Sequence, residues 1–363
     1  MHVLFLKSEA RPGPCQYEKV RSGEVVEHYF YYPKAKNALK RAKDFWSYYQ
    51  KGFKTVWQEM GKPDLIHCHV MTRHALMAAW FQLRYGIPYV ITEHWSRYYR
   101  RDFHNFLHRW LTRRVARKAR RIMPVSESLA QAMRECGIQG RYTIVRNVVD
   151  DFFYQTPICL SQAEGTRTEA SHALKKRKLK TIVHVCCFDE TAKNNFGLLR
   201  ALKTLALTRS DFRILFVGDG NDWEATRDYA KLLNFKTWQV VFTGKLQPRE
   251  VKDILDQSCF MVLFSNYETA SVVIGEAMAC GKPVVATRTG GIPEIVDESN
   301  GILVEPKDER AVWKAMDEML DRYEEYDSKR IKEKAGIFRF AHVGSQLHRI
   351  YEESRSKQDK DLQ

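Results

Sequence analysis

Short apolar runs alternate with longer amphipathic segments along most of this 363-residue chain. Runs such as 65–68 and 89–92 have the length and apolar character of buried strands, and the segment 74–85 between them has apolar residues at helical spacing. Strands that alternate with helices predict parallel sheets covered by helices on both faces. By the same criteria we expect further strands over 121–125, 143–145, 181–185, 213–217, 240–242, 260–264 and 283–286, and a helix over 128–136.

The alternation stops over residues 155–180, which are polar and contain Pro157, Gly165 and a run of four basic residues. Such a break between two alternating sets predicts two doubly wound, Rossmann-like α/β domains facing a central cleft. The expected division is a first domain over 1–150, a hinge near 149–154, a linker or surface excursion over 151–180, a second domain over 181–337, and a last helix over 338–354 that packs back on the first domain.

The charge of the chain is unevenly distributed. Residues 1–150 contain 27 Lys and Arg against 12 Asp and Glu, whereas residues 151–363 contain 32 of each kind. The whole excess of +15 therefore lies in the first domain. This asymmetry predicts an anionic partner for that domain, which is a membrane surface, a nucleic acid or an acidic substrate.

No segment has the roughly 20 uninterrupted apolar residues that a membrane-spanning helix needs, and the first residues do not resemble a secretory leader. The eight cysteines are scattered, without C-x-x-C spacing, and several lie in apolar runs. Both features favour a cytosolic protein with reduced, buried thiols.

The densest chemical signal lies between residues 263 and 296. A strand ends near Ser265, a loop carries Glu268, and a helix is expected from Ala270 or Ser271 to Cys280, with Gly281 as its left-handed cap. Glu276 lies two turns along this helix. A helix N-terminus suits a diphosphate, and the two carboxylates could hold the hydroxyls of a sugar and a ribose. A later pair, Gly290-Gly291, is expected to let the backbone approach a ligand closely.

Around these residues the sequence resembles the retaining glycosyltransferases of family four, which have the GT-B architecture. The resemblance rests on the two glutamates with seven residues between them, followed by "EAMACGKPVVATRTGGIPEIV". It extends through "YGIPYVITEHW" and "RRIMPVSESLAQAMRECGI" in the first domain, and through "AKNNFGLLRAL" and "ILFVGDG" in the second. The resemblance therefore covers most of the chain.

The resemblance implies roles for individual residues. Glu276 would hold the ribose hydroxyls of the nucleotide, and Glu268 the hydroxyls of the donor sugar. Lys193 would neutralise the leaving phosphate, and His94 would lie across the cleft near the donor sugar and the acceptor. Further donor contacts are expected from Ser271, Val272, Gly244 and Asn147.

The expected function is retaining transfer of a sugar from a nucleotide-sugar to a lipid-linked or polysaccharide-precursor acceptor. No D-x-D motif is present, and the histidines at 67, 69 and 74 have no acidic or cysteine partner at metal-ligand spacing. We therefore expect neither a metal nor a cofactor. Two alternatives remain: another GT-B enzyme such as an epimerase, or a catalytically impaired nucleotide-sugar-binding protein. The second is favoured by the short region 8–26 and by the lack of an arginine in 186–190, where many relatives have one.

The segment 97–121 combines aromatic and aliphatic residues at helical spacing with many arginines. One interpretation is an amphipathic helix on anionic lipid, and the other is a helix that packs on its own domain with a solvated charged face. We expect peripheral contact with the inner face of the membrane, and no nucleic-acid partner, because no recognised binding module accompanies the charge. The residues assigned to the membrane or acceptor are Arg109, Trp110, Arg113, Arg114 and Arg117.

Overall fold

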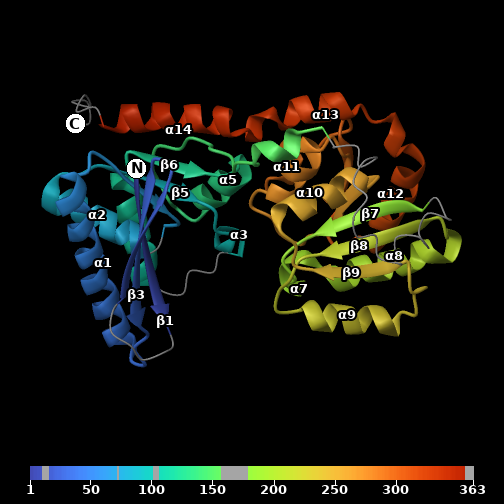
Figure 1. Cartoon of the computed structure of the whole chain (residues 1–363), viewed down its shortest axis with the longest axis horizontal. Helices are drawn as coiled ribbons and strands as arrows, with labels where there is room; N and C mark the ends of the chain where they lie inside the picture. The colour runs from blue at the N-terminus through green and yellow to red at the C-terminus, as the bar shows by residue number, and fades with distance from the viewer. Residues whose placement is uncertain (10–15, 72, 101–105, 157–178, 356–363) are drawn as a thin grey trace.

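The computed structural model describes residues 1–9, 16–71, 73–100, 106–156 and 179–355. Two lobes lie side by side (Figure 1), the first built from the N-terminal part of the chain and the second from the C-terminal part. Most of the linker or excursion expected over 151–180 lies outside the described residues. Within them, no helix is long and apolar enough to cross a membrane.

The second lobe contains one six-stranded sheet in the order β12-β11-β10-β7-β8-β9, with every neighbouring pair parallel. This is the doubly wound order, in which the chain reverses direction between the first strand, β7, and the fourth, β10. The bounds are β7 Lys180–Val185, β8 Phe212–Val217, β9 Val240–Gly244, β10 Phe260–Leu263, β11 Val284–Thr287 and β12 Gly301–Val304. All but β12 were predicted.

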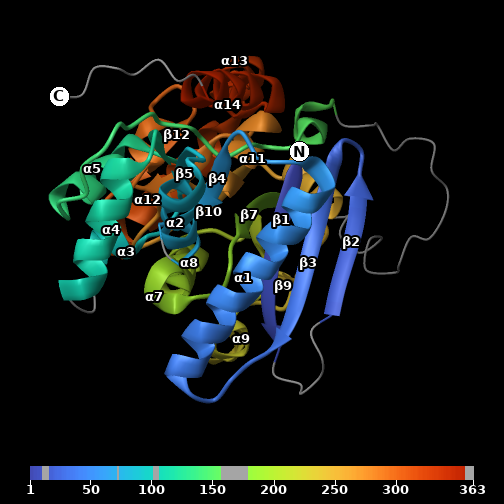
Figure 2. The same cartoon turned by 90° about the vertical axis from the view of Figure 1, so that its left-hand side faces the viewer.

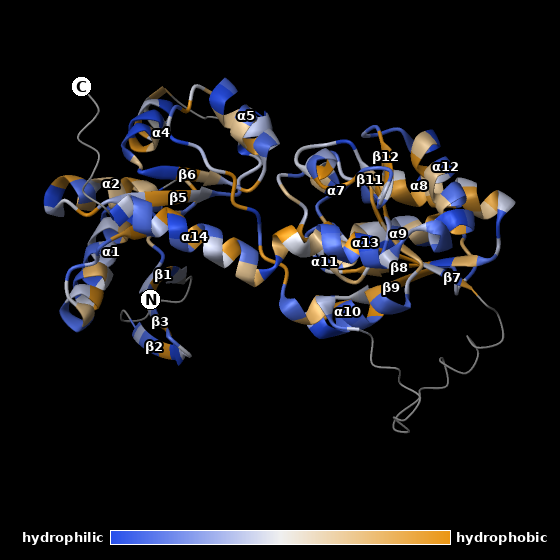
Figure 3. Ribbon diagram, turned by 90° about the horizontal axis from the view of Figure 1, so that it is seen from above, coloured by the Kyte–Doolittle hydropathy of each residue, from blue (hydrophilic) through white to orange (hydrophobic). Residues whose placement is uncertain are grey.

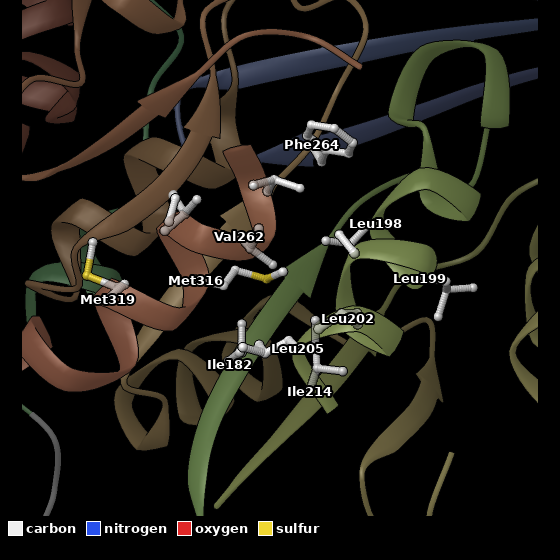
Figure 4. Packing of buried hydrophobic residues seen from close by; sticks show 14 of the residues in the cluster. Ile182, Leu198, Leu199, Leu202, Leu205, Ile214, Val262, Phe264, Met316 and Met319 are labelled. Atoms are coloured by element: carbon white, nitrogen blue, oxygen red, sulfur yellow. The ribbon is translucent and has the colours of Figure 1, made fainter. Parts of the chain in front are cut away.

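Helices cover both faces of this sheet. On one face, leucines of α8 and methionines of α12 pack on Ile182 and Ile214 of the strands (Figure 4). On the other face, Met261 and Leu263 pack against Ile274 and other residues of α11. The helices are α7 Glu190–Lys193, α8 Asn195–Thr208, α9 Trp223–Leu232, α10 Pro248–Gln257, α11 Val272–Ala279, α12 Glu309–Arg322 and α13 Ser328–Lys334.

The first lobe has two three-stranded sheets among its described residues, β1-β3-β2 and β4-β5-β6. The second of these is parallel throughout, whereas β2 runs antiparallel to β3 (Figure 2). The strands are β1 His2–Glu9, β2 Gln16–Ser22, β3 Val25–Pro33, β4 Ile66–His69, β5 Tyr89–Glu93 and β6 Arg121–Pro124. The helices are α1 Ala38–Met60, α2 Arg73–Tyr85, α3 Arg97–Arg100, α4 Phe106–Lys118 and α5 Glu127–Glu135.

Our prediction of a strand over 143–145 was wrong. This segment runs beside β6. The amides of Thr143 and Val145 donate to the carbonyl oxygens of Ile122 and Pro124, at 3.0 and 3.1 Å. Only an isolated bridge between Ile122 and Tyr142 forms next to it. Val145 is therefore buried and Ile144 partly buried beside the sheet, without extending it.

The chain crosses between the lobes twice. A short 3-10 helix, Asp151–Tyr154, follows the first lobe. A second 3-10 turn, Ala335–Phe338, leads into α14, Phe340–Arg355, which runs back along the first lobe (Figure 1). Val343 and Ile350 of α14 are buried in one cluster with residues of β5 and β6. The last helix thus contributes to the core of the lobe from which the chain began.

Candidate active site

Lys193 and Glu268 meet at the point where the strand order of the second lobe reverses. Lys193 ends α7 in the connection after β7, and Glu268 lies in the loop after β10. The two side chains form an ion pair, and the Ser265 hydroxyl donates to the same carboxylate oxygen, Oε1, at 3.0 Å. In doubly wound sheets, ligands bind at this reversal, outside the carboxyl ends of the strands. The fold therefore places both residues where a ligand is expected.

The two loops are also joined through their backbones. The Asn266 amide donates to the Ala192 carbonyl at 2.7 Å, and its side-chain nitrogen donates to the Thr191 carbonyl at 3.0 Å. These bonds fix the distance between the loop of Lys193 and the loop of Glu268. The ion pair is therefore supported by the surrounding backbone and does not depend on two flexible side chains alone.

Gly290 and Gly291 support the loop of Glu268. Gly290 has φ +52°, and a Cβ atom there would lie 1.5 Å from the Glu268 carbonyl oxygen. A Cβ atom on Gly291 would lie 2.6 Å from the Thr269 carbonyl oxygen. The backbone that approaches these glycines belongs to the glutamate loop. The close approach to a ligand that we expected from them stays a prediction.

Helix α11 begins immediately after this loop. Ser271 is its N-cap residue in extended conformation, and the Ser271 side chain does not cap the helix. The first-turn amides, including that of Val272, are therefore left for a ligand, and a helix N-terminus favours an anion. At the other end, Gly281 has φ +73° and its amide donates to the Met278 carbonyl at 2.8 Å, which is the predicted left-handed cap.

Glu276 lies on the second turn of α11 and is half-buried. Burial raises the pKa of its carboxyl group to about 7. Within the part of the chain that the structure describes, no hydrogen bond or ion pair to this carboxylate is recorded. A half-buried carboxylate without a partner is costly unless a ligand supplies donors.

Gly244 ends β9 with φ +78°, and its carbonyl oxygen accepts a hydrogen bond from the Gly218 amide at 3.0 Å. No atom lies within 4 Å of the position that a Cβ would take at Gly244. Gly244 is therefore on the same edge of the sheet as Lys193, at the end of a strand farther from the reversal.

His94 lies on the first lobe, immediately after β5. Its ring stacks on that of His69, with centroids 5.5 Å apart, and its Nε2 lies 3.2 Å from the His69 Nδ1. The nearby Asn147 side chain acts to raise the pKa of His94, so two of the predicted residues lie close together here. Burial lowers the pKa of both His69 and His94, which favours neutral rings.

His67 completes the histidine stack. Its ring centroid lies 4.6 Å from that of His69, and its nitrogens are 2.7 Å from the hydroxyls of Thr92 and Tyr351. Burial lowers the pKa of His67 to about 3. Because Tyr351 belongs to α14, the last helix helps to hold the strand that carries His69.

Glu93 supports the candidate site, and our sequence reasoning missed it. It is fully buried, and its carboxylate accepts hydrogen bonds from the amides of Met71, His94 and Trp95. The Tyr98 hydroxyl donates to it at 3.2 Å. Glu93 therefore fixes the segments that follow β4 and β5, beside His69 at the end of β4 and His94 just after β5. The sequence offered one signal for this residue: an acidic side chain at the end of an otherwise apolar strand.

The two lobes are in direct contact beside the site. The Ser126 hydroxyl donates to the Thr269 carbonyl at 2.6 Å. Glu294 accepts the amides of Glu127 and Ser128 at the start of α5, at 3.1 and 2.8 Å, and pairs with Arg146 at 3.3 Å. A carboxylate from the second lobe thus stabilises a helix N-terminus of the first. The lobes are closed around the loop of Glu268.

The arginines assigned to the membrane or acceptor lie on α4. Arg109, Arg114 and Arg117 are exposed, and Trp110 is 47% exposed. Arg113 instead packs on Gly137 and donates to the Cys136 carbonyl at 3.0 Å. Four of these five side chains therefore line an accessible surface, and Arg113 has a structural role within the lobe.

The structure separates the three histidines that we considered as metal ligands. His74 packs on Phe45, with ring centroids 5.5 Å apart, away from the stack of His67 and His69. Among the described residues, a different group, His2, His28 and Glu59, has nitrogen and oxygen atoms within 4.8 Å of one another. Its atoms are already engaged: the His2 and His28 ring nitrogens lie 2.8 Å apart, and Lys19 pairs with Glu59 at 2.6 Å.

Comparison with known proteins agrees with this arrangement. Residues 2–151 match the model of Glycosyltransferase Family 4, and residues 179–322 match the model of Glycosyl transferases group 1. The two matches cover both lobes. The chain belongs to the group 1 glycosyltransferases of family four.

Particular relatives extend the comparison. The N-acetyl-alpha-D-glucosaminyl L-malate synthase of Bacillus anthracis is 32% identical over 42% of this chain, a match that spans only 43% of that relative. The putative teichuronic acid biosynthesis glycosyltransferase TuaC of Bacillus subtilis is 25% identical over 88% of this chain and 75% of its own length. Anabaena HepE, solved with UDP and glucose, has a TM-score of 0.71 at 17% identity and covers 96% of this chain and 98% of its own. The predicted GT-B fold is confirmed.

Proposed function

We propose that this protein transfers a sugar from a nucleotide-sugar to an acceptor hydroxyl, with retention of configuration and without a metal ion. The observation that carries the proposal is Glu276, a half-buried carboxylate without a recorded protein partner, on the helix whose free N-terminus adjoins the pair of Lys193 and Glu268. A nucleotide-sugar would supply hydroxyl donors for the two carboxylates, and a diphosphate for Lys193 and the helix N-terminus. Anabaena HepE, which has the same fold and was solved in complex with UDP and glucose, supports this choice of ligand.

Donor binding would redistribute the charges at the site. The ribose hydroxyls would donate to Glu276, and the diphosphate would accept from the first amides of α11 and from Lys193. The ammonium group of Lys193 now pairs with Glu268. It would then lie between that carboxylate and the phosphate. Glu268 would keep one oxygen for Ser265 and Lys193 and offer the other to hydroxyls of the sugar.

The reaction needs stabilisation of the leaving group more than a protein nucleophile. The bond between the anomeric carbon and the phosphate oxygen breaks, and the acceptor oxygen forms a new bond on the same face. The acceptor proton passes to the departing phosphate, and a nucleoside diphosphate leaves. Negative charge builds on that phosphate, so Lys193 and the α11 amides are the groups that would lower the barrier. The neutral ring of His94 would position the acceptor side.

The acceptor is proposed to be a lipid-linked or polysaccharide-precursor glycan at an anionic membrane surface. Helix α4 supports the membrane contact because Phe106 is 83% exposed, Trp110 is 47% exposed, and the neighbouring Arg109 and Arg114 are accessible. An exposed aromatic pair among arginines is typical of helices that bind at the lipid interface. Figure 3 shows α4 at the outer side of the first lobe, away from the second. The name of TuaC, a putative teichuronic acid biosynthesis glycosyltransferase, supports a glycan acceptor.

The first test is thermal stabilisation by UDP-, GDP- and ADP-sugars, with the free nucleotides measured alongside. A ligand present at 100 times its Kd stabilises the native state by about 2.7 kcal/mol, so one nucleotide series should raise the melting temperature clearly. Glu276→Gln should reduce that shift, whereas Glu298→Gln, an exposed control on the same lobe, should not. No shift with any series in the wild type would refute the donor site. Binding without release of nucleoside diphosphate on any acceptor extract would instead favour a binding protein that does not transfer.

A further inference from the structure

A cavity of about 250 Å³ lies in the first lobe, at the carboxyl ends of two parallel strands. Ser8 and Tyr32 line it from the ends of β1 and β3, and Arg73 lines it from the first residue of α2. The first turns of α1 and the residues before them complete the wall. The other lining side chains used below are Lys34, Arg41 and Asp44.

The charges around this cavity are unbalanced. Lys34, Arg41 and Arg73 place three cations on the wall, and Asp44 is the single acid among the lining residues. Within the described part of the chain, none of the three cations has a recorded hydrogen bond or ion pair. In the second lobe, by contrast, Arg209 pairs with three different aspartates at 2.8 to 3.1 Å. Three neighbouring cations without ion-pair partners repel one another unless an anion joins them.

The cavity combines partly buried walls with exposed cations: Tyr32 and Asp44 are partly buried, whereas the side chains of Lys34, Arg41 and Arg73 are exposed. The Tyr32 ring stacks on that of Tyr48, with centroids 4.8 Å apart. The Arg73 guanidinium lies 5.9 Å from the Phe45 ring centroid. Two hydroxyls and three cations therefore surround a space large enough for a phosphate group and its neighbours.

The cavity is close to the acceptor side of the proposed active site. Arg73 follows His69 by four residues, so their Cα atoms lie at most about 14 Å apart even in a fully extended chain. The His69 ring stacks on that of His94. Both histidines belong to the first lobe, whereas Lys193 belongs to the second. A molecule whose reacting hydroxyl lies near His94 could thus extend a second group into the cavity.

We propose that this cavity binds a phosphate group of the acceptor, and that Lys34, Arg41 and Arg73 hold it. The proposal rests on the transferase function above and adds the chemical class of the acceptor. A phosphate is favoured over a carboxylate because three cations against one acid leave two positive charges, which a phosphate dianion or a diphosphate neutralises. Guanidinium groups also bind phosphate oxygens in a bidentate manner. The bound phosphate would orient the acceptor hydroxyl towards the anomeric carbon.

The binding test uses inorganic pyrophosphate, titrated by calorimetry at constant ionic strength. The nucleoside diphosphate found in the thermal screen is added first at saturation, so that the donor site is filled. Pyrophosphate should bind to the wild type and to Lys40→Gln, a matched exposed control on α1. It should bind at least tenfold more weakly to the double variant R41Q/R73Q. Equal affinity in the double variant, or no binding to the wild type, would overturn the proposal.

Three further measurements make the outcome specific. The double variant should keep the melting temperature of the wild type and its affinity for the nucleotide, so that a folding defect or a failed donor site is recognised separately. The phosphate could belong to a soluble sugar phosphate or to a lipid-linked sugar. A transfer assay with a soluble sugar phosphate, and another with a polyprenyl-diphosphate-linked sugar in micelles, would show which of the two is accepted. With either acceptor, R41Q/R73Q should raise KM tenfold or more with little change in kcat. Equal KM values for wild type and variant would contradict phosphate recognition at this cavity.

Discussion

The carboxylate of Glu276 should destabilise the free protein, and its removal should therefore stabilise the fold while weakening donor binding. Burial raises its pKa from 4.5 to about 7. At about 1.4 kcal/mol for each pKa unit, this rise corresponds to a cost of about 3 kcal/mol for the ionised form in the folded protein. The figure is an upper bound, because the carboxylate is only half-buried and water still reaches it.

The sign of the effect depends on pH. Below pH 4.5 the carboxyl group is protonated in both states, so it contributes no difference. Between pH 4.5 and about 7 the folded state binds more protons than the unfolded state, so the free energy of unfolding falls as pH rises. Above about pH 7 the full cost is present. Glu276→Gln should remove this pH dependence, because a neutral amide has no proton to lose.

The assay is the melting temperature of wild type, Glu276→Gln and the exposed control Glu298→Gln at pH 5 and pH 8. For domains of this size, each kcal/mol shifts the melting temperature by roughly 2–4 °C. The Glu276→Gln variant should melt several degrees above wild type at pH 8 and close to it at pH 5, and its nucleotide affinity at pH 8 should fall tenfold or more. If the difference in melting temperature were the same at both pH values, the unpaired carboxylate would not be its cause.

Other perturbations test separate parts of the site. Lys193→Ala should lower kcat more than donor affinity, because charge on the leaving phosphate develops in the transition state; an equal loss of both would indicate positioning alone. Gly290→Ala should destabilise the second lobe by several kcal/mol, seen in denaturant unfolding, because its Cβ would lie 1.5 Å from a carbonyl oxygen. Glu93→Gln should lower turnover while leaving nucleotide affinity unchanged, and a change in nucleotide affinity would contradict its role in the first lobe. Trp110→Ala should reduce flotation with anionic liposomes at low salt, and Trp238→Ala is the matched control on the second lobe.

The sequence predicted the second lobe more completely than the first. Its central strands are mostly apolar and largely buried, and β10 and β11 are buried at every position, so pattern and burial agree there. Strand β12 escaped prediction because it begins with Gly301, which leaves a run of only three apolar residues; the missing Cβ of Gly301 lets the Val284 carbonyl come close. A short strand of this kind is defined by its neighbours and not by its own pattern.

The first lobe was harder to predict because its strands are only partly covered. Strand β2 is exposed along its whole length, so no alternation of apolar and polar residues marked it. The ion pair of Lys193 with Glu268, and the contact of His94 with Asn147, join segments far apart in the chain. Such pairs follow from the strand order, which the sequence pattern alone does not specify. Their proposed roles remain predictions.

The contacts between the lobes suggest why donor binding and closure should occur together. The loop from Glu268 to Ser271 lies between the glycine pair of its own lobe and the start of α5. A Cβ on Gly291 would meet both the Thr269 carbonyl and the Ser126 side chain, at 2.6 and 2.7 Å, so three segments meet without spare space. Opening the lobes would break the bond from Ser126 to Thr269 and remove Glu294 from the amides that it caps. The loop that carries Glu268 would then lose one of its two supports. If Glu268 contacts the donor sugar as proposed, the donor should bind more tightly to the closed form than to an open one.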